Sequence, residues 1–365
     1  MDFAWPLPLR ELADEAAAVA REWAPAVPED TWLIATSEAF AREMGRRGWL
    51  GMTWPVEEAG HGRSPLERFV VTEALISGGA PMATAYFSDR QIGPTLLAFG
   101  SPEQRARFLP EIAAGESSWC IGMSEPDAGS DVASLRTRAV LSRAGDVFVV
   151  NGQKVWTSGA ATARWCYLIA RTDPDAPAHR GLSELTVDMS LAGISVRPIR
   201  DMTGNEHFCE VVFENVEVPA SCLVGELNGS FGQVMRQLEH ERGGIDRLVS
   251  NRRLYLDALA GADVGSPVVR QEIAALESGY RIGRLLVLRE VLGQAPRSFS
   301  AATKTFCTEY EQRVAQFAAR VAGPSSMVWD RVARGVCYAP AYTIMGGTTQ
   351  ILRNILAERV LSLPR

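Results

Sequence analysis

The sequence predicts an α+β protein of three successive parts. A helical N-terminal domain is expected over residues 1–117, a mostly antiparallel β-domain over residues 118–228, and a C-terminal four-helix bundle over residues 229–365. Apolar residues recur at helical spacing before residue 115 and again after residue 230. Between them lie short runs rich in Val, Ile, Phe and Trp, separated by Gly, Asp and Pro turns, which is typical of antiparallel strands.

The N-terminal part is predicted to be helices joined by one long loop. Residues 49–62 form this loop, because Gly and Pro punctuate them. Ser64 is placed as an N-cap, and Ser101 is followed by Pro102 in the first turn, a pattern typical of helix starts. The predicted helices span residues 9–24, 38–47, 65–76, 93–99 and 102–114.

The β runs and the C-terminal helices follow in order. The β runs span residues 139–141, 147–150, 165–170, 185–187, 194–196 and 209–213. Helical periodicity then continues from residue 230 to the end. It is broken at residues 260–267, 294–297 and 336–342, which leaves four long helices to form the bundle.

Composition excludes several classes of protein. The chain has 365 residues, 47% of them hydrophobic, which is enough for more than one packed unit. A net charge of −6 without a dense Lys/Arg block gives no footprint for nucleic acid. The N-terminus has no signal-peptide pattern, and no stretch approaches the roughly 20 apolar residues of a membrane helix. Six cysteines without metal-like spacing predict reduced thiols in a cytoplasmic protein and no metal site.

Three short segments carry the chemical signal. Residues 120–132 read Cys-Ile-Gly-Met-Ser-Glu-Pro-Asp-Ala-Gly-Ser-Asp-Val, residues 151–158 read Asn-Gly-Gln-Lys-Val-Trp-Thr-Ser, and residues 346–354 read Gly-Gly-Thr-Thr-Gln-Ile-Leu-Arg-Asn. The first could be an ordinary polar turn, with Cys120 as a packing residue. Hydroxyls, small residues and one large aromatic on turns beside β runs also suit a flat polar heterocycle.

Together the three segments resemble those of the acyl-CoA dehydrogenase family. The family pattern is small-x-[Ser/Thr]-Glu-x-x-x-Gly-[Ser/Thr]-Asp, then Trp-x-[Ser/Thr], then Gly-Thr-x-Gln-Ile-x-Arg-Asn, and the resemblance covers nearly the whole chain. It implies a central β-barrel, bound FAD, and oxidation of an acyl-CoA thioester to a trans-2-enoyl-CoA in lipid metabolism. A weakly acidic α-proton must then pass to a carboxylate while a hydride leaves the β-carbon.

The resemblance also implies which carboxylate acts as the base. The family places a Glu either one residue before the C-terminal Gly-Thr, where this chain has Gly346, or on the first long helix of the third domain, where Glu241 matches. Glu239 and Arg242 match substrate-binding positions. The alternative is a solvated helix turn with a Glu239–Arg242 ion pair. His240 lies between the acids, but adjacent helix residues point about 100° apart, so we expect it to face away.

Cofactor contacts follow from the same resemblance. Ser124 would bond the pyrimidine side of the flavin, Trp156 would cover one ring face, Ser158 would bond near N5, and Ser130 would serve both pyrophosphate and substrate. An isolated Trp156 could instead be a core aromatic of a strand. The expected cofactor-binding residues are Met123, Ser124, Gly129, Ser130, Trp156, Thr157, Ser158, Thr348 and Gln350.

One departure concerns assembly. Many family members carry Arg-x-x-Phe-Gly after the first long helix, whose Arg reaches the FAD of a neighbouring subunit, and residues 259–267 have neither Arg nor Phe. We expect a homo-oligomer, dimer or tetramer, with a heteromer as the alternative, and an electron-transfer flavoprotein as acceptor. Two other readings stay open: a flavoenzyme acting on a carrier-protein-bound acyl group, by desaturation or a monooxygenase-like reaction, and a non-catalytic subunit of a heteromeric dehydrogenase.

Overall fold

The computed structural model describes residues 4–24, 32–296 and 298–364, without the side chains of Thr84 and of residues 238–241. The chain forms two compact units. The helical unit consists of Met1–Phe40, Arg63–Ala83 and Leu238–Arg365, and the sheet unit consists of Ala41–Gly62 and Thr84–Gln237. The order of a helical, a β and a helical part is as predicted, whereas the domain bounds at residues 117 and 228 stay a prediction.

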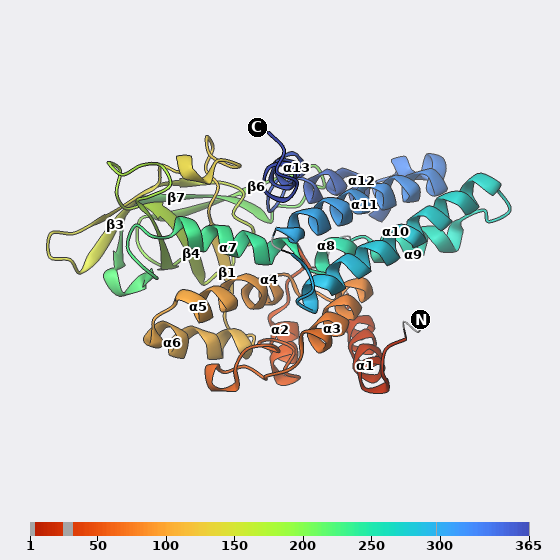
Figure 1. Cartoon of the computed structure of the whole chain (residues 1–365), viewed down its shortest axis with the longest axis horizontal. Helices are drawn as coiled ribbons and strands as arrows, with labels where there is room; N and C mark the ends of the chain where they lie inside the picture. Colours follow the sequence, from red (N-terminus) through yellow and green to blue (C-terminus); the bar gives the residue numbers. More distant parts are fainter. Residues whose placement is uncertain (1–3, 25–31, 297, 365) are drawn as a thin grey trace. The chain divides into compact units, whose positions relative to one another are not determined.

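Long helices dominate the helical unit, and α10, α11 and α12 run side by side in Figure 1. Its helices are α1 (Leu7–Trp23), α3 (Pro65–Gly78), α8 (Asp246–Val249), α9 (Arg252–Gly261), α10 (Pro267–Val291), α11 (Phe299–Ala322), α12 (Arg331–Tyr342) and α13 (Thr349–Ile355). Buried Tyr338, Ala339 and Tyr342 of α12 pack with Leu254 of α9 and Ala318 of α11. Within the described ranges, no helix has the length and apolarity needed to cross a bilayer.

Helix α3 ties α1 and α10 together. It begins with the predicted cap: the Ser64 hydroxyl accepts from the N–H of Glu67, whose carboxylate in turn accepts from the N–H of Ser64. At its other end, a Cβ on Gly78 would lie 2.5 Å from the Cβ of Ala20, so only glycine allows α1 and α3 to approach this closely. In the middle, Glu73 accepts hydrogen bonds from Tyr280 (2.8 Å) and Arg284 (2.7 Å) of α10.

The predicted break at residues 336–342 is wrong, because α12 continues to Tyr342. Pro340 lies inside the helix, where it removes one backbone hydrogen bond. It does so in the last turn, and the buried rings of Tyr338 and Tyr342, one turn apart, pack edge to face at 5.5 Å. The actual interruption comes earlier, between the end of α11 and the Asp330 side chain that caps α12.

The sheet unit combines one sheet with helices from both sides of it in sequence. Its helices are most of α2 (Glu38–Arg46), α4 (Ala83–Phe87), α5 (Gly93–Phe99), α6 (Pro102–Ala113) and the first half of α7 (Phe231–Arg242). Its strands are β1 (Trp119–Gly122), β2 (Arg138–Leu141), β3 (Val147–Lys154), β4 (Trp165–Arg171), β5 (Leu182–Asp188), β6 (Ile194–Ile199), β7 (Phe208–Pro219) and β8 (Leu223–Val224).

The sheet is open, which corrects the expected closed barrel. Its strand order is β6-β7-β3-β2-β4-β5-β8, with β1 added in parallel beside β4, and β2 and β4 also meet in parallel. The two ends of this order do not pair with each other. Edge strand β6 contains Pro198, and β8 has two residues, and both features are typical of strands that end a sheet rather than continue it.

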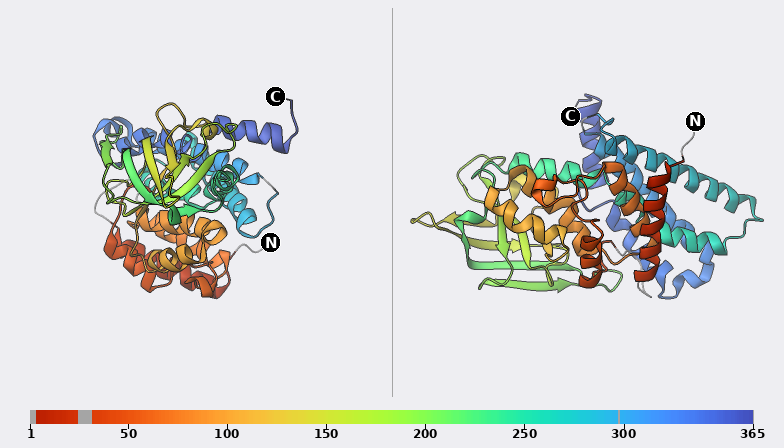
Figure 2. Two further views of the ribbon diagram at one scale, coloured as in Figure 1. Left: turned by 90° about the vertical axis from the view of Figure 1, so that its left-hand side faces the viewer. Right: turned by 90° about the horizontal axis from the view of Figure 1, so that it is seen from below.

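The central strand β4 is buried on both faces. One face carries Cys166, Leu168 and Ala170 into an apolar cluster shared with β5 and β7. On the other face Trp165 stacks with Trp119 of β1 at a ring distance of 5.9 Å and meets Phe108 of α6 edge to face at 5.0 Å. Figure 2 shows the orange helices of residues 93–113 lying along this face of the sheet.

Candidate active site

Strand β1 leads directly into the first predicted cofactor segment. The chain turns at Glu125, whose N–H donates to Ala128 O (2.9 Å), while the N–H of Ala128 donates back to Glu125 O (3.1 Å). Before this turn, the carbonyl of Ser124 accepts from the N–H of Val155 at 2.9 Å. This bond brings the first and second predicted segments together. Met123 and Ser124 are half-buried, whereas Gly129 and Ser130 are exposed.

A buried ion pair joins these two segments. Lys154, fully buried, donates to Glu125 Oε1 at 2.8 Å and to the carbonyl of Met123 at 3.0 Å. Glu125 also accepts from the backbone N–H groups of Arg136 (2.7 Å) and Thr137 (2.8 Å). Both carboxylate oxygens of Glu125 are therefore hydrogen-bonded and the ammonium makes two bonds, which is the kind of pairing under which a buried ion pair is tolerated.

Burial and pairing act in opposite directions on this pair. Burial lowers the pKa of Lys154 to about 8, although the negative charge of Glu125 raises it. Burial alone raises the pKa of Glu125, but Lys154 and the N–H of Arg136 lower it below its usual value. Both groups are therefore ionised at neutral pH.

Trp156 stands out from the strand that precedes it. Its backbone has φ +60°, a left-handed conformation that a bulky residue seldom adopts and that costs on the order of 1–3 kcal/mol. It is fixed on one side by the Val155–Ser124 bond and on the other by Thr157 and Cys209, which exchange N–H···O bonds of 2.9 and 3.2 Å. The indole is 58% exposed and meets Phe208 edge to face at 5.8 Å. Trp156 is therefore not a core aromatic.

His207 packs against Phe208, the ring that meets Trp156 edge to face. Its ring lies 3.9 Å from the ring of Phe208, and its Nδ1 is 3.7 Å from Asp201. Burial lowers the pKa of His207 to about 4, against the opposing effect of Asp201, so the imidazole is neutral at physiological pH.

The polar groups around Trp156 fit a flavin. Within the described part of the chain, the half-buried hydroxyls of Ser124 and Ser158 have no hydrogen-bond partner, and the hydroxyl of Thr157 is buried without one. Buried and half-buried hydroxyls normally find partners in the protein. Unused hydroxyls beside an exposed indole therefore suit a flat ring system with a polar edge.

In the helical unit, the end of α7 meets the turn before α13. Arg242, which is 7% exposed, donates from Nε to the carbonyl of Gly346 at 3.3 Å. Lys304 of α11, fully buried, donates to the carbonyls of Gly347 (3.0 Å) and Tyr342 (3.3 Å). Gly346 and Gly347 have φ of +65° and +97°. Arg242, the residue after Glu241, therefore contacts Gly346, the other position at which the family places its base.

The remaining predicted residues divide into described and undescribed. Thr348 caps α13, its hydroxyl accepting from the N–H of Ile351 at 3.2 Å, and Gln350 is exposed on that helix. The side chains of Glu239, His240 and Glu241 lie outside the described residues. Their assigned roles stay predictions.

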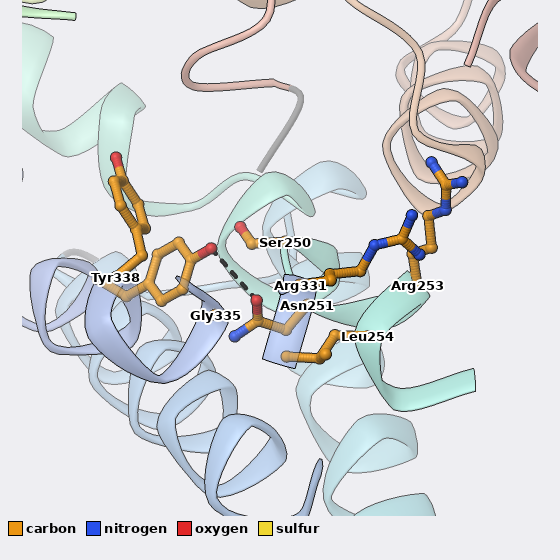
Figure 3. A pocket seen from close by; sticks show the side chains of 8 residues that line it. Ser250, Asn251, Arg253, Leu254, Arg331, Gly335 and Tyr338 are labelled. Carbon is orange, nitrogen blue, oxygen red and sulfur yellow. Dashed lines mark hydrogen bonds between the residues drawn. The ribbon is translucent and has the colours of Figure 1, made fainter. Parts of the chain in front are cut away.

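A small pocket of the helical unit contains none of the predicted site residues (Figure 3). It lies where the start of α9 faces α12, and Tyr342 donates across it to Asn251 at 3.4 Å. It is lined by Ser250, Asn251, Arg253, Leu254, Arg331, Gly335, Tyr338 and Tyr342. A Cβ on Gly335 would lie 2.7 Å from Leu254, so the two helices are already in close contact there. The pocket is therefore a narrow gap between two packed helices.

Sequence reasoning missed the residues that support the site. Glu125 and Lys154 both lie within the recognised segments, and a Lys in a strand beside a Glu in a turn was a signal that they pair. Phe208 and Lys304 carried no comparable signal, because their partners are distant in sequence.

An open sheet with an exposed indole and, in the residues that the structure describes, hydroxyls without partners beside its strand ends is consistent with a flavin-binding oxidoreductase. Comparison with known proteins narrows this class. The chain matches the acyl-CoA dehydrogenase N-terminal domain over residues 9–116, the middle domain over residues 120–216 and the C-terminal domain over residues 231–361. The chain belongs to the acyl-CoA dehydrogenase family. It is an FAD-dependent oxidoreductase that acts on acyl-CoA.

Individual relatives cover at least 90% of the chain. The acyl-CoA dehydrogenase IpdE1 of Mycobacterium tuberculosis strain H37Rv is 35% identical over 342 residues, which cover 90% of this chain and 88% of that protein. The solved Tcur3481-Tcur3483 steroid ACAD is 31% identical with a TM-score of 0.88, and each chain is covered completely. The ChsE4-ChsE5 complex from M. tuberculosis is 31% identical with a TM-score of 0.86, again with complete coverage of both chains.

Proposed function

We propose that this chain oxidises an acyl-CoA thioester between its α and β carbons to a trans-2-enoyl-CoA, with Glu241 as the base. The observation that carries the proposal is the hydrogen bond from Arg242 to Gly346 O, because it joins the two places where the family holds its base. One of those places has a glycine, so only the α7 locus carries a carboxylate. The α-proton passes to Glu241, and the β-hydrogen leaves with its electron pair.

The sheet unit would hold the cofactor. FAD, when bound, supplies the two-electron acceptor for the β-hydrogen. Trp156 would exclude water from one ring face, and the hydroxyls of Ser124 and Ser158 would bond the polar edge. The Glu125–Lys154 pair orients both segments, because it holds Met123 O and the backbone beyond the turn at once.

For the acyl group we propose a bulky, ring-bearing thioester. The support is twofold: a relative 31% identical over the whole chain is a steroid ACAD, and the Gly346–Gly347 turn presents no side chains. Glu239 and Ser130 are proposed as substrate contacts, and Thr348 and Gln350 as cofactor contacts. An acyl group on a carrier protein remains the competing substrate, and an electron-transfer flavoprotein is the proposed acceptor.

A second proposal concerns assembly with a different partner chain. The loop between α9 and α10, where many relatives place Arg-x-x-Phe-Gly, is closed by Arg270, which donates to the loop carbonyls of Val264 (2.9 Å) and Gly265 (2.8 Å). Arg270 is thus bonded to its own loop through Nη1. The two relatives solved as Tcur3481-Tcur3483 and ChsE4-ChsE5 are named as pairs of chains. A heteromer therefore competes with the expected homo-oligomer.

The test of the base is Glu241→Gln, compared with Glu239→Gln as a matched change two residues away on α7. FAD-loaded protein is mixed anaerobically with straight-chain, branched and steroid-side-chain acyl-CoA thioesters and with an acyl-carrier thioester, and the loss of flavin absorbance is followed. Loss of a general base slows the reaction by about 10²–10⁴-fold, so Glu241→Gln should show this loss with thioester binding retained. Rapid bleaching in Glu241→Gln together with a slow Glu239→Gln would move the base to Glu239.

A further inference from the structure

A buried carboxyl lies on the sheet unit away from the flavin segments. Glu184 of β5 and Tyr167 of β4 are both fully buried, on the face opposite the apolar cluster that holds Leu168 and Leu185. Tyr167 donates to Glu184 Oε2 at 2.9 Å. Burial and the neighbouring Glu184 raise the pKa of Tyr167, so it remains a donor at all physiological pH values.

The first two turns of α7 lie against this pair. Gln233 donates to the same oxygen, Glu184 Oε2, and to the carbonyl of Val224 on β8 at 3.3 Å. Gln237, one turn further on, is 5% exposed and lies beside the Tyr167 hydroxyl. The helix start is fixed to β5 as well, because the N–H of Ser230 donates to Leu182 O at 3.0 Å. These hydrogen bonds hold the start of α7 against the sheet, and we call this contact the seat of α7.

The two carboxylate oxygens of Glu184 do not have the same number of hydrogen-bond partners. Two donors converge on Oε2, while Oε1 of Glu184 and both amide atoms of Gln237 are buried without a partner among the described residues. The partners of Glu184 are the neutral groups of Tyr167 on β4 and Gln233 on α7, and the nearby Thr186 hydroxyl is turned to Cys222 O (3.4 Å). An ionised Glu184 would therefore be a buried charge whose hydrogen-bond partners are all neutral, and such a charge is costly to bury.

We propose that Glu184 is a positioning residue whose protonation state controls how firmly the first two turns of α7 are held against the sheet, and through the continuous helix how well ordered the turn after Gln237 is. That turn contains residues 238–242, one turn beyond the contact on one continuous helix. The neutral acid is tolerated at this buried position, whereas ionisation favours the entry of water to the carboxylate and so weakens the contact between α7 and the sheet. Burial raises the pKa of Glu184 to about 7, although its bonds from Gln233 and Tyr167 lower it, so the change falls near neutral pH. The inference rests on the proposed function in assigning the base to this turn.

The test is hydrogen exchange of the FAD-loaded protein, read by mass spectrometry on peptides covering residues 231–242 at pH 6 and pH 8 and corrected for intrinsic exchange. In the wild type, protection of this segment should fall about tenfold at pH 8, because the seat is lost locally. Glu184→Gln keeps the shape and cannot ionise, so its protection should not change with pH. Tyr167→Phe removes one donor that lowers the Glu184 pKa, so the loss should move to higher pH. Equal pH dependence in wild type and Glu184→Gln overturns the inference.

Flavin reduction by a steroid-side-chain acyl-CoA separates this inference from the proposed function. With Glu184 as a positioning residue, the wild-type rate declines above pH 7 and Glu184→Gln lacks this decline, while Glu241→Gln lowers the rate at every pH. If no thioester reduces the flavin, the proposed function fails and the exchange result still decides the role of Glu184. An alkaline decline shared by wild type and Glu184→Gln refutes the link between the seat and the reaction.

Discussion

The ion pair between Glu125 and Lys154 gives the sharpest test of how the site is held. Lys154→Met leaves a carboxylate that is 8% exposed without its cation, and removing one partner of a buried pair costs about 3–5 kcal/mol. Glu125→Gln leaves the ammonium buried, at a similar expected cost. The double variant has no buried charge, so its loss should be no more than about 3 kcal/mol, instead of the roughly 6 kcal/mol or more expected from additivity.

Urea unfolding followed by near-ultraviolet circular dichroism measures these values, and FAD retention is measured in parallel. Arg197→Met is the control, because Arg197 pairs with Glu210 at 3.3 Å in the same sheet but is 71% exposed, and such pairs contribute about 0–1 kcal/mol. The cost of Glu125→Gln should shrink as pH rises toward 8 and then level off, because Lys154 without the Glu125 charge, which raises its pKa, loses its proton below pH 8. Additive losses in the double variant would show that the two side chains act separately, and the account of the site as one fastened unit would be wrong.

Two further outcomes are expected. The purified chain should be yellow with non-covalent FAD and should retain it more tightly after mixing with a partner chain; equally tight retention in the homo-oligomer removes the reason for a partner. Gly346→Glu on a Glu241→Gly background should restore part of the flavin reduction if both loci serve one substrate carbon, but φ +65° at Gly346 disfavours any side chain, so a lower thermal midpoint is also expected. Full recovery without destabilisation would contradict that strain.

Helix starts were predictable because their signals are local. Ser64 and Ser101 each form a capping box, the latter with Gln104 three residues later, so a few neighbouring residues decide the boundary. Helix α5 also has the bounds that the sequence pattern indicates, residues 93 and 99, but its start has no side-chain cap and continues from the turn of residues 88–92. The starts of α3 and α6 therefore follow from capping chemistry, whereas that of α5 does not.

Features that depend on distant partners were not predictable. The polar run of residues 88–92 is a fully buried π-helical turn, and its Asp89 accepts from the N–H of Gly51 at 2.7 Å, a contact that no local pattern encodes. Strand β1 has four residues and gains its place by parallel pairing with β4, some 45 residues later. Sheet closure likewise depends on whether two edge strands meet, which periodicity does not specify.

The candidate site also combines features that local sequence predicts with features that depend on distant residues. Trp156 and the serines around it were recognisable as a motif, since their spacing is local to two turns. Their conformation was not, because the left-handed backbone at Trp156 is imposed by Ser124 on one side and Cys209 on the other. Glu184 carried no sequence signal at all: in a strand, an acidic residue normally faces water, and burial on both faces of β5 is a property of the packed sheet.

The two buried carboxyls of the sheet unit act differently because their partners differ. Glu125 faces a cation and two backbone N–H groups, so its charge is matched and its geometry changes little across the physiological pH range. Glu184 faces neutral side chains, so its charge is unmatched and near neutral pH it can exist in either form. The Glu125–Lys154 ion pair favours one fixed arrangement of the backbone around it. Glu184, which has no cation beside it in the parts of the chain that the structure describes, allows two arrangements, one for each of its protonation states. If the proposed function holds, the fixed arrangement lies at the segments that would bind the cofactor, and the adjustable one lies under the helix that would carry the base.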